Sequence, residues 1–319
     1  MRILVIGYNA FDVLVPVAGR PEPDSKLDVG RIHLSGGGPG ATAAVALARL
    51  GADVSLITPL TGDTPGRLQE EELLAAGVDL AHCPRLGDRS SALAVILVDR
   101  RAQERTIYWA RGDLPLLEAE QVDPAWLHDV DLLYCDGHEN PAAVRLARAA
   151  QAAGLPVVLD AGSVRHGIRD LVPLCTDVVS STVFAGQLTG CASPLAALRR
   201  LRDLGPERVA MTFGRDGCLG LRDDRPLLVP AFAVPVTDTT GAGDAFHAGY
   251  AFARARGDDL RTCLEFGAAV AALKCRGWGG RQTLPELAEV DAFLASADPL
   301  PLDALRGRVD AGRPSRDPE

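Results

Sequence analysis

Short apolar runs alternate with helix-like stretches rich in Ala, Leu and Arg, and this alternation continues from Met1 to about Ala295. The runs are apolar throughout, as expected of strands that are covered on both faces. They lie at residues 3–6, 54–58, 132–135, 157–160, 178–180 and 209–212. The helix-like stretches 41–50, 141–153 and 198–204 are each followed by a glycine, which suits the left-handed residue that closes a helix. The alternation predicts an α/β protein built on a parallel sheet.

Two segments break this alternation. Residues 13–35 contain three prolines and then a short predicted strand near 31–34. Residues 92–99 and 105–109 are typical of a hairpin around the polar residues 100–103. Together they predict a small separate sheet or lid, with lid segments at about 13–35 and 90–113. We expect one domain over residues 1–297, followed at 298–319 by a loosely ordered C-terminal tail rich in Pro, Arg and Asp.

The charge balance and the cysteines argue against several classes of protein. Lys and Arg number 33 against 42 Asp and Glu, and only 5% of the residues are aromatic, so the chain lacks a basic surface and stacking rings for nucleic acid. Its seven cysteines are scattered and never spaced as C-x-x-C, which argues against disulfides or zinc and predicts a reducing cytoplasm. The opening MRILVIG is too short for a signal peptide or a membrane span. We therefore expect a cytoplasmic protein with neither nucleic-acid nor membrane partners.

The most informative segment is DTTGAGDAFH at residues 238–247. It follows a strand-like run at 232–236 and precedes an apolar helical stretch. Gly241 and Gly243 let a ligand approach the backbone, and the unpaired N–H groups at a helix start bind anions. Asp244, in the first helical turn, is stabilised as a carboxylate that can take a proton from a neighbouring hydroxyl. An anion site beside a base suggests phosphoryl transfer, while the simpler reading is a capped helix with a tight turn.

Other motifs carry less information. Residues 36–41 satisfy G-x-G-x-x-A but follow an irregular segment instead of the first strand, which disfavours dinucleotide binding. A P-loop is excluded because no G-x-x-x-x-G-K-[ST] occurs and the only lysines are Lys26 and Lys274. His247, one turn beyond Asp244, is more typical of a packed helix residue than of a second base. Cys275 has no neighbouring histidine in the sequence, which argues against a reactive thiol.

The run DTTGAGDAF resembles the C-terminal signature of the ribokinase-like (PfkB) sugar kinases. Further likeness follows in order along the chain and spans roughly residues 1–295. It includes Gly7 with Asp12, and the segments 37–41, 62–66, 77–79, 153–160, 188–190 and 212–217. The resemblance implies a ribokinase-like, three-layer, doubly wound and mainly parallel sheet with a small β-rich lid.

The resemblance also implies site residues. Asp244 would be the general base that activates the sugar hydroxyl. The backbone of three residues would form the anion hole for the transferring phosphoryl group: Gly241, Ala242 and Gly243. Sugar hydroxyls would be held at Asp12, Gly37 and Gly38, and a carboxylate that accepts two such hydrogen bonds suits a polyol.

Nucleotide and ion sites follow from the same resemblance. The loop that contacts the nucleotide would be formed by Thr212, Gly214 and Gly217. Asp238 and Thr240 match a monovalent-cation site, for K+, in some members. Members bind ATP with Mg²⁺ and close a lid over the sugar, which excludes water. Lids of this kind often pair two subunits, so the resemblance allows a homodimer through the lid.

The chain departs from the family pattern at two places. Thr42, counted here as substrate-binding, stands where the family usually has Asn. Residues 181–184 replace an Asn-x-x-Glu element whose Glu organises phosphate and Mg²⁺, and ketohexokinase-like members lack that Glu too. The loss leaves the Mg²⁺ site unassigned.

Two further positions have alternative readings. Residues 108–115 resemble the lid segment of ketohexokinases and other ketose kinases, so Arg111 could reach an anionic or polyhydroxy substrate; the alternative is a solvated lid charge. His138 follows the run 132–135 and would lie near the carboxyl end of a strand, where α/β sites form. It is therefore a candidate substrate contact.

The sequence thus predicts an ATP-dependent kinase that phosphorylates a hydroxymethyl group of a small sugar, a ketose or a furanose. Two alternatives remain open. One is a nucleoside (adenosine-type) kinase. The other, suggested by the missing Asn-x-x-Glu, is a non-catalytic homologue that senses a sugar or a nucleotide.

Overall fold

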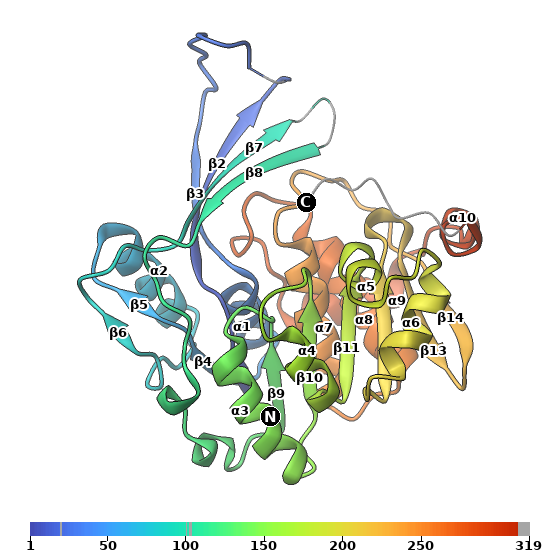
Figure 1. The fold of residues 1–319 in the computed structure, drawn as a ribbon. Helices are drawn as coiled ribbons and strands as arrows, with labels where there is room; N and C mark the ends of the chain where they lie inside the picture. Colours follow the sequence, from blue (N-terminus) through green and yellow to red (C-terminus); the bar gives the residue numbers. More distant parts are fainter. Residues whose placement is uncertain (20, 100, 102–103, 312–319) are drawn as a thin grey trace.

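The protein is built on an eight-stranded sheet of order β14-β13-β12-β11-β10-β9-β1-β4 (Figure 1). A computed structural model describes residues 1–19, 21–99, 101 and 104–311. The strands of this sheet are β1 (Arg2–Ile6), β4 (Asp53–Ile57), β9 (Leu132–Cys135), β10 (Val157–Ala161), β11 (Asp177–Ser181), β12 (Arg208–Thr212), β13 (Cys218–Arg222) and β14 (Arg225–Val229). The helices are α1 (Pro39–Arg49), α2 (Thr64–Ala75), α3 (Asn140–Ala152), α4 (Ile168–Leu171), α5 (Thr182–Thr189), α6 (Pro194–Arg202), α7 (Ala242–Ala255), α8 (Leu260–Lys274), α9 (Leu287–Ser296) and α10 (Asp303–Ala311).

The six apolar runs in the sequence are the six parallel strands of this sheet. Strands β4, β1, β9, β10, β11 and β12 pair in parallel, whereas β13 and β14 pair antiparallel at the edge. Because the strands are parallel, their carboxyl ends meet at one edge of the sheet, where ligand sites of α/β proteins form. The predicted α/β fold, a mainly parallel doubly wound sheet in three layers, is confirmed.

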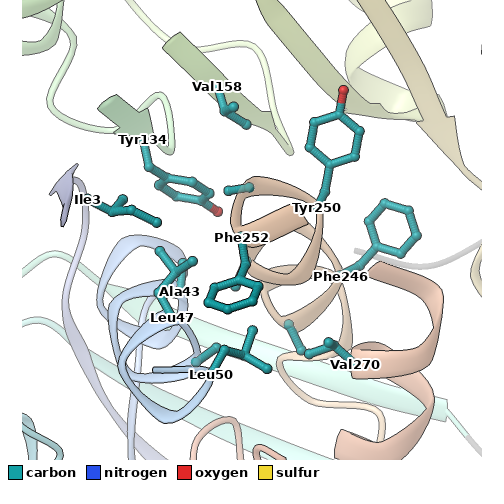
Figure 2. Packing of buried hydrophobic residues seen from close by; sticks show 14 of the residues in the cluster. Ile3, Ala43, Leu47, Leu50, Tyr134, Val158, Phe246, Tyr250, Phe252 and Val270 are labelled. Carbon is teal, nitrogen blue, oxygen red and sulfur yellow. The ribbon is translucent and has the colours of Figure 1, made fainter. Parts of the chain in front are cut away.

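Helices cover both faces of the sheet. Side chains of α1, α7 and α8 form one buried cluster with one face of the strands, and those of α3 to α6 form a second cluster on the other face. Figure 2 shows the first cluster, in which Tyr134 of β9 lies close to Phe252 of α7 and Leu47 of α1. The position of α7 against the sheet is therefore fixed by apolar packing along its length.

The two segments that break the alternation form a second sheet, which projects from the body of the molecule (Figure 1). Its order is β3-β2-β7-β8, with β2 (Ala10–Val17), β3 (His33–Gly37), β7 (Leu93–Asp99) and β8 (Glu104–Ala110). Beside it lies a short pair formed by β5 (Leu60–Thr61) and β6 (Arg85–Leu86). The turn expected at residues 100–103 lies largely outside the described residues.

The strand expected at residues 232–236 is wrong. Apart from a single bridge between Phe232 and Pro299, this segment has no ladder partner among the described residues. Pro230 and Pro235 lack the N–H that a strand donates, so an apolar run here cannot build a continuous ladder. The chain enters α7 from an irregular segment instead of a strand.

The loosely ordered tail expected at 298–319 is also wrong as far as the chain is described. Residues 303–311 form α10, whose Leu305 is fully buried and whose Arg308 pairs with Asp216 at 2.9 Å between Nε and Oδ2. Leu302, Leu305 and Val309 all pack on the second cluster. Their spacing of three and four residues is that of one helix face. Residues 312–319 lie outside the described part.

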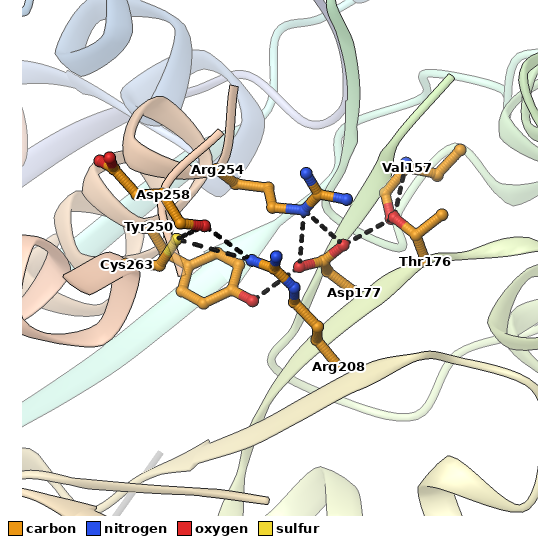
Figure 3. A network of polar contacts seen from close by, with 8 residues as sticks. All are labelled: Val157, Thr176, Asp177, Arg208, Tyr250, Arg254, Asp258 and Cys263. Atoms are coloured by element: carbon orange, nitrogen blue, oxygen red, sulfur yellow. Dashed lines mark hydrogen bonds and ion pairs between the residues drawn. The ribbon is translucent and has the colours of Figure 1, made fainter. Parts of the chain in front are cut away.

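A buried polar network ties the body of α7 to the sheet (Figure 3). Asp177, at the start of β11, is fully buried. Its carboxylate accepts hydrogen bonds from Tyr250 Oη at 2.7 Å, Arg254 Nε at 3.1 Å and Thr176 Oγ1 at 2.6 Å. These contacts lie at the amino end of the strands and hold the C-terminal half of α7, so that its N-terminal end is left facing the opposite edge.

Within the described ranges, no helix is both long enough and apolar enough to span a lipid bilayer. All seven cysteines are free thiols, and all but Cys191 are buried.

Candidate active site

Helix α7 begins at the carboxyl edge of the sheet with the DTTGAGD turn. Gly241 is its N-cap with φ of +74°, and a Cβ there would lie 2.8 Å from Cα of Gly280, so only glycine fits. A Cβ at Gly243 would meet no atom within 4 Å, because this residue faces open space. The exposed first turn of a helix offers free N–H groups and a positive dipole end. In this turn the Ala242 amide donates to the carbonyl oxygen of Thr239 at 3.1 Å, so the anion hole expected at Gly241, Ala242 and Gly243 stays a prediction.

Asp244 lies in the first turn of α7 and is partly exposed, not sealed in the core. Burial raises the pKa of its carboxyl group to about 7, and the nearby Asp160 and Asp136 carboxylates add to the rise. Arg105 and His247 oppose it. A carboxylate with a pKa near neutrality is well matched to accept a proton from an alcohol.

Three buried side chains lie beneath Asp244. Tyr134 Oη donates a hydrogen bond to Asp160 Oδ2 at 3.1 Å, and His247 Nδ1 lies 3.2 Å from Asp160 Oδ1 without the alignment of a hydrogen bond. Burial raises the pKa of Asp160 to about 8 and lowers that of His247 to about 4, so the imidazole is neutral. His247 is thus a packed helix residue, as the sequence indicated.

Asp136 is a structural centre of the site that sequence reasoning missed. Its carboxylate accepts hydrogen bonds from three backbone amides: Tyr8 N at 2.7 Å, Gly40 N at 2.8 Å and His138 N at 2.9 Å. Tyr8 and His138 lie in the loops that follow β1 and β9, and Gly40 lies in the first turn of α1. An acidic residue directly after the buried run 132–135 was the available signal in the sequence.

The predicted sugar-binding residues meet at the base of the lid. Asp12 of β2 is buried, and burial raises its pKa to about 7 while Arg281 opposes the rise. Gly37 lies directly against the Asp12 carboxylate. Gly38 has φ of +84°, and a Cβ there would lie 2.6 Å from the carbonyl oxygen of Tyr8. Thr42, one turn into α1, is fully buried.

Arg281 joins this group and was also missed. It is 1% exposed, and its Nη2 donates to Asn9 Oδ1 at 2.8 Å and to the carbonyl oxygen of Gly37. Its Nη1 lies 3.7 Å from Glu72 Oε2 and forms no hydrogen bond with the described residues. The guanidinium therefore places a buried positive charge beside Asp12. Its partners lie more than 200 residues away in the chain, so local pattern gave no signal.

Arg111 is neither free nor a solvated lid charge, which corrects the alternative reading. Its Nη2 pairs at 2.5 Å with Glu139 Oε1, a fully buried carboxylate, and its Nε donates to the carbonyl of Leu114 at 3.1 Å. Its guanidinium lies 5.4 Å from the centre of the Tyr8 ring. The ring of His138 stacks on the ring of Tyr8, with 4.6 Å between the ring centres. Both predicted contacts thus surround Tyr8.

Lid and body touch at two arginines. Arg165, in the loop after β10, lies 5.5 Å from the ring of Trp109 on β8. On the other side, Arg105 of β8 donates from Nη1 to Thr239 Oγ1 at 3.1 Å, two residues before the anion hole. The Nε atom of Arg105 is buried and unpaired among the described residues. The lid is therefore in contact with the turn that leads into α7.

The predicted nucleotide residues form a separate group. Thr212 ends β12. Gly214 begins a short 3-10 turn with φ of +56°, and Gly217 caps that turn with φ of +111°. They share the carboxyl edge with α7. In the position of the family's Asn-x-x-Glu, Ser181 caps α5 by accepting from Phe184 N at 2.9 Å, and Phe184 is fully buried. The position of the family's Glu is therefore taken by a phenylalanine that packs in the core.

Asp238 holds the turn before α7 together. Its Oδ1 accepts from Thr240 N at 2.9 Å and from Thr240 Oγ1 at 2.8 Å, while its Oδ2 accepts from Gly279 N at 2.9 Å. Its carbonyl oxygen accepts a hydrogen bond from the buried Lys274 Nζ at 3.0 Å. The two residues predicted for a monovalent cation are thus bonded to each other and lie beside an ammonium group of the chain.

A cavity of about 300 Å³ lies elsewhere, between α5, α6 and β12. Its walls are almost wholly apolar and include Val183, Ala197 and Met211. Met211 belongs to the cluster on the sheet face opposite α7. The cavity is therefore not part of the Asp244 site.

Comparison with known proteins agrees with this geometry. Residues 1–287 match the family described as pfkB family carbohydrate kinase. An ATP-dependent ribose-1-phosphate kinase from Halopiger xanaduensis is 30% identical over 301 residues, covering 92% of this chain and 98% of that protein. A nucleoside kinase from Methanothermobacter thermautotrophicus is 25% identical over 292 residues, covering 90% and 93%. The structure of Arabidopsis thaliana ribokinase complexed with ribose and ATP shares the fold, with a TM-score of 0.77 at 23% identity over 92% of this chain and 98% of that one.

The family match covers residues 1–287, which include the body and the lid. The 30% identity to the ribose-1-phosphate kinase extends over 92% of this chain. The ribokinase-like fold and the resemblance seen in the sequence are both confirmed by these comparisons. The chain belongs to the pfkB family of carbohydrate kinases and is a phosphotransferase that acts on an alcohol group.

Proposed function

We propose that the protein transfers the γ-phosphoryl group of ATP to a hydroxymethyl group of a small sugar, a ketose or a furanose. The observation that carries this proposal is Asp244. Its carboxylate is partly exposed, has a pKa raised by burial to about 7, and lies on the same helical turn as the open backbone of Gly243. A base and an anion site at one helix tip are what phosphoryl transfer to an alcohol requires.

Each step has a residue to perform it. Asp12 and the Gly37–Gly38 backbone hold the sugar hydroxyls, and Asp244 takes the proton of the attacking alcohol. The oxygen of that alcohol forms a bond to the γ-phosphorus as the bond from this phosphorus to the ADP oxygen breaks. The amides of residues 241–243 hold the equatorial oxygens of the transferring group, where preorganised donors act most strongly. The lid excludes water that would otherwise accept the phosphoryl group.

ATP enters with its Mg²⁺, and the nucleotide is held by Thr212, Gly214 and Gly217. Among the described residues, no cluster of three or more His, Cys, Asp or Glu side chains is placed to hold a metal ion. Mg²⁺ is typically held by one or two carboxylates together with substrate phosphates and water. Mg²⁺ would therefore be held largely by the ATP phosphates, where it would neutralise charge during transfer.

An anionic sugar is the substrate subclass that the cluster around Tyr8 favours. Burial, together with the charges of Arg165 and Arg111, lowers the pKa of His138 to about 3, so both arginines lie near the imidazole. The Glu139 carboxylate offsets part of the charge of Arg111. Helix α3 also begins at this point, and its N-terminal dipole end adds to the positive charge there. The relative named as a ribose-1-phosphate kinase agrees with this subclass.

A nucleoside is the second candidate acceptor, because the relative from Methanothermobacter thermautotrophicus is named as a nucleoside kinase. Tyr8, His138 and Trp109 form an aromatic group that could pack against a base, with Tyr8 and Trp109 ring centres 6.3 Å apart. A non-catalytic sensing role would be compatible with the lost Asn-x-x-Glu, but retention of the whole DTTGAGD run argues against it.

A coupled assay of ADP release tests these proposals together. The panel comprises hexoses, ketoses, pentoses, ribose 1-phosphate, sugar acids, sulfonated sugars and nucleosides, each with MgATP. We expect sugar-dependent release, with sugars that carry an anionic group preferred over their neutral counterparts. Release that only nucleosides stimulate would favour the second candidate, and release that no acceptor changes would support the sensing role.

The outer lid face supports a homodimer. One row across the lid sheet comprises Leu34, Val13, Val95 and Tyr108, which are in register on the face opposite Asp12. Leu34 is 53% exposed and Tyr108 is 62% exposed. We propose that two copies pair through this outer lid face, burying its apolar surface.

The variant Val95→Asp should convert this dimer into a monomer, because it places a charge in the middle of the buried row. Sedimentation velocity of both proteins measures the mass, and circular dichroism checks that the variant is folded. A wild-type monomer, or a variant that remains a dimer, would refute this interface.

We also propose that the enzyme works in the reducing cytoplasm, where cysteines such as the seven free thiols of this chain stay reduced.

Activity should also depend on pH with a sign fixed by Asp244. Its pKa is raised to about 7 by burial, and only its carboxylate form accepts a proton, so kcat/KM should fall as the pH is lowered through about 7. Asp12 also has a pKa raised to about 7, so the profile of Asp12→Asn is needed to show that the acid limb belongs to Asp244. Arg105→Gln removes a charge that lowers the pKa of Asp244 and should move the limb to higher pH. A profile that stays level through this range would contradict the assignment.

A further inference from the structure

Lys274 places a buried ammonium group against the turn that leads into the predicted anion hole. It is the last residue of α8 and is 0% exposed. Its Nζ donates to the carbonyl oxygen of Asp238 at 3.0 Å. Burial lowers the pKa of Lys274, and the negative charge of Asp238 opposes that shift. A lysine is almost never fully buried unless it is paired, so this position needs an explanation.

The contacts around Lys274 reach the catalytic turn. Asp238 binds both the amide and the hydroxyl of Thr240, the residue before Gly241. Thr237 N donates to the carbonyl of Cys275 at 2.8 Å, and Thr283 Oγ1 donates to the carbonyl of Lys274 at 2.9 Å. The end of α8 and the loop after it therefore hold the turn from which the anion-hole amides extend.

The same turn does not fit a monovalent metal ion. Oδ1 of Asp238 accepts two hydrogen bonds from Thr240, Oδ2 accepts one from Gly279, and the carbonyl oxygen accepts from the ammonium group of Lys274. A second cation within a few ångströms of Nζ would be repelled, and this repulsion is strong where water is excluded. The charge that a bound K+ would bring is thus already supplied by the chain.

We propose that the Lys274 ammonium group replaces a monovalent cation at the Asp238 turn, so that the anion hole is held in its active geometry without K+. Lys274 is a positioning residue in this account, because it contacts the turn and not the substrate. The expected effect on catalysis rests on the proposed function, whereas the expected effect on cation binding does not.

The first test uses the wild-type protein and its thermal unfolding. The melting temperature is measured at equal ionic strength in KCl, NH₄Cl, NaCl and choline chloride. We expect no specific stabilisation by K+ or NH₄+, because the ammonium group fills the site. A melting temperature that rises in KCl or NH₄Cl but not in NaCl or choline chloride would show a bound ion and overturn the proposal, whatever the substrate of the enzyme is.

The second test removes the charge. In Lys274→Ala, the Asp238 carbonyl loses its partner and a space opens, so we expect a lower melting temperature that K+ or NH₄+ partly restores and Na+ does not. With the acceptor identified in the ADP-release assay, kcat should fall about tenfold or more and recover in the same salts, because a buried acceptor has lost its donor. Arg261→Met is the matched control. It removes one positive charge from the exposed start of the same helix, and its response to the salts should equal that of the wild type.

The outcomes distinguish failure of the cation replacement by Lys274 from failure of the proposed kinase function. Restoration of Lys274→Ala by K+ or NH₄+ supports the replacement, even if no sugar proves to be a substrate. A variant as stable and active as the wild type, or one that no salt restores, contradicts it. If Lys274→Ala does not fold in any salt, Lys274→Gln replaces it, because glutamine keeps a hydrogen-bond donor but carries no charge. Wild-type stability of Lys274→Gln would show that only the hydrogen bond matters and would refute the role of the charge.

Discussion

Replacing Asp244 by asparagine should reduce kcat by between about 10²-fold and 10⁴-fold, the usual contribution of a positioned general base. Asparagine has the shape of aspartate but cannot take a proton from the attacking alcohol. Single-turnover measurements with saturating sugar and MgATP isolate the chemical step. The dissociation constant for MgATP, measured by calorimetry, should remain close to that of the wild type, because nucleotide contacts are assigned to other residues.

The stability of Asp244→Asn separates catalysis from structure. Because burial raises the pKa of Asp244 to about 7, its negative charge destabilises the folded state above that pH. The neutral amide removes this cost, so the melting temperature above neutral pH should be equal to or higher than that of the wild type. Asp259→Asn is the control for the same substitution at another helix start. Asn caps a helix about as well as Asp, so this variant should keep the wild-type turnover. Turnover by Asp244→Asn at the wild-type rate would remove the assigned base.

Replacing Asp177 by alanine should lower the free energy of unfolding by about 3–5 kcal/mol, the range for breaking a buried ion pair from one side. The fully buried Asp177 carboxylate is the shared acceptor of Tyr250, Arg254 and Thr176 (Figure 3). Its removal leaves a phenol and a guanidinium unpaired against the sheet. Urea unfolding followed by circular dichroism measures the change.

Asp224→Ala is the matched control for this prediction. Asp224 also accepts from two arginines, Arg199 at 3.1 Å and Arg202 at 3.0 Å, but its side chain is 55% exposed. Exposed ion pairs contribute little because water and salt screen them. We therefore expect a much smaller loss of stability in this variant. Equal losses in the two variants would show that burial does not set the strength of the Asp177 network.

Local pattern predicted the fold well because parallel strands and their helices carry strong local signals. The run 132–135 is β9 without any shift, and Gly51, which follows α1, has the expected left-handed φ of +95°. The run 232–236 was misread because its apolar side chains resemble those of a strand while Pro230 and Pro235 prevent a ladder. The tail was misread because its composition outweighed the helical spacing of Leu302, Leu305 and Val309.

Local chemistry alone pointed to site residues only within one short motif, whereas Asp12, Gly37 and Gly38 were named through the family resemblance. Asp244 and the glycines around it are adjacent in sequence and could be read directly. Asp136 acts through amides of Tyr8 and Gly40, which are 128 and 96 residues away. Arg281 and Lys274 likewise act on turns that the fold alone brings near. The partners of these groups are brought near only by the tertiary fold, so a single sequence carries no periodic signal for them.

The proton-coupled ³¹P NMR spectrum of the product tests the central claim most directly. The sugar with the highest kcat/KM in the panel is incubated with MgATP and the enzyme. A phosphate that has been transferred to a hydroxymethyl group through Asp244 and the α7 amides should appear as a phosphomonoester triplet, split by the two protons on the carbon. The spectrum of the acceptor before reaction is subtracted, because an acceptor such as ribose 1-phosphate has a phosphate signal of its own. A new doublet would place the transferred phosphate on a secondary carbon, and the absence of any new sugar-phosphate signal beside ADP and inorganic phosphate would show that no sugar had been phosphorylated; either result would contradict the account.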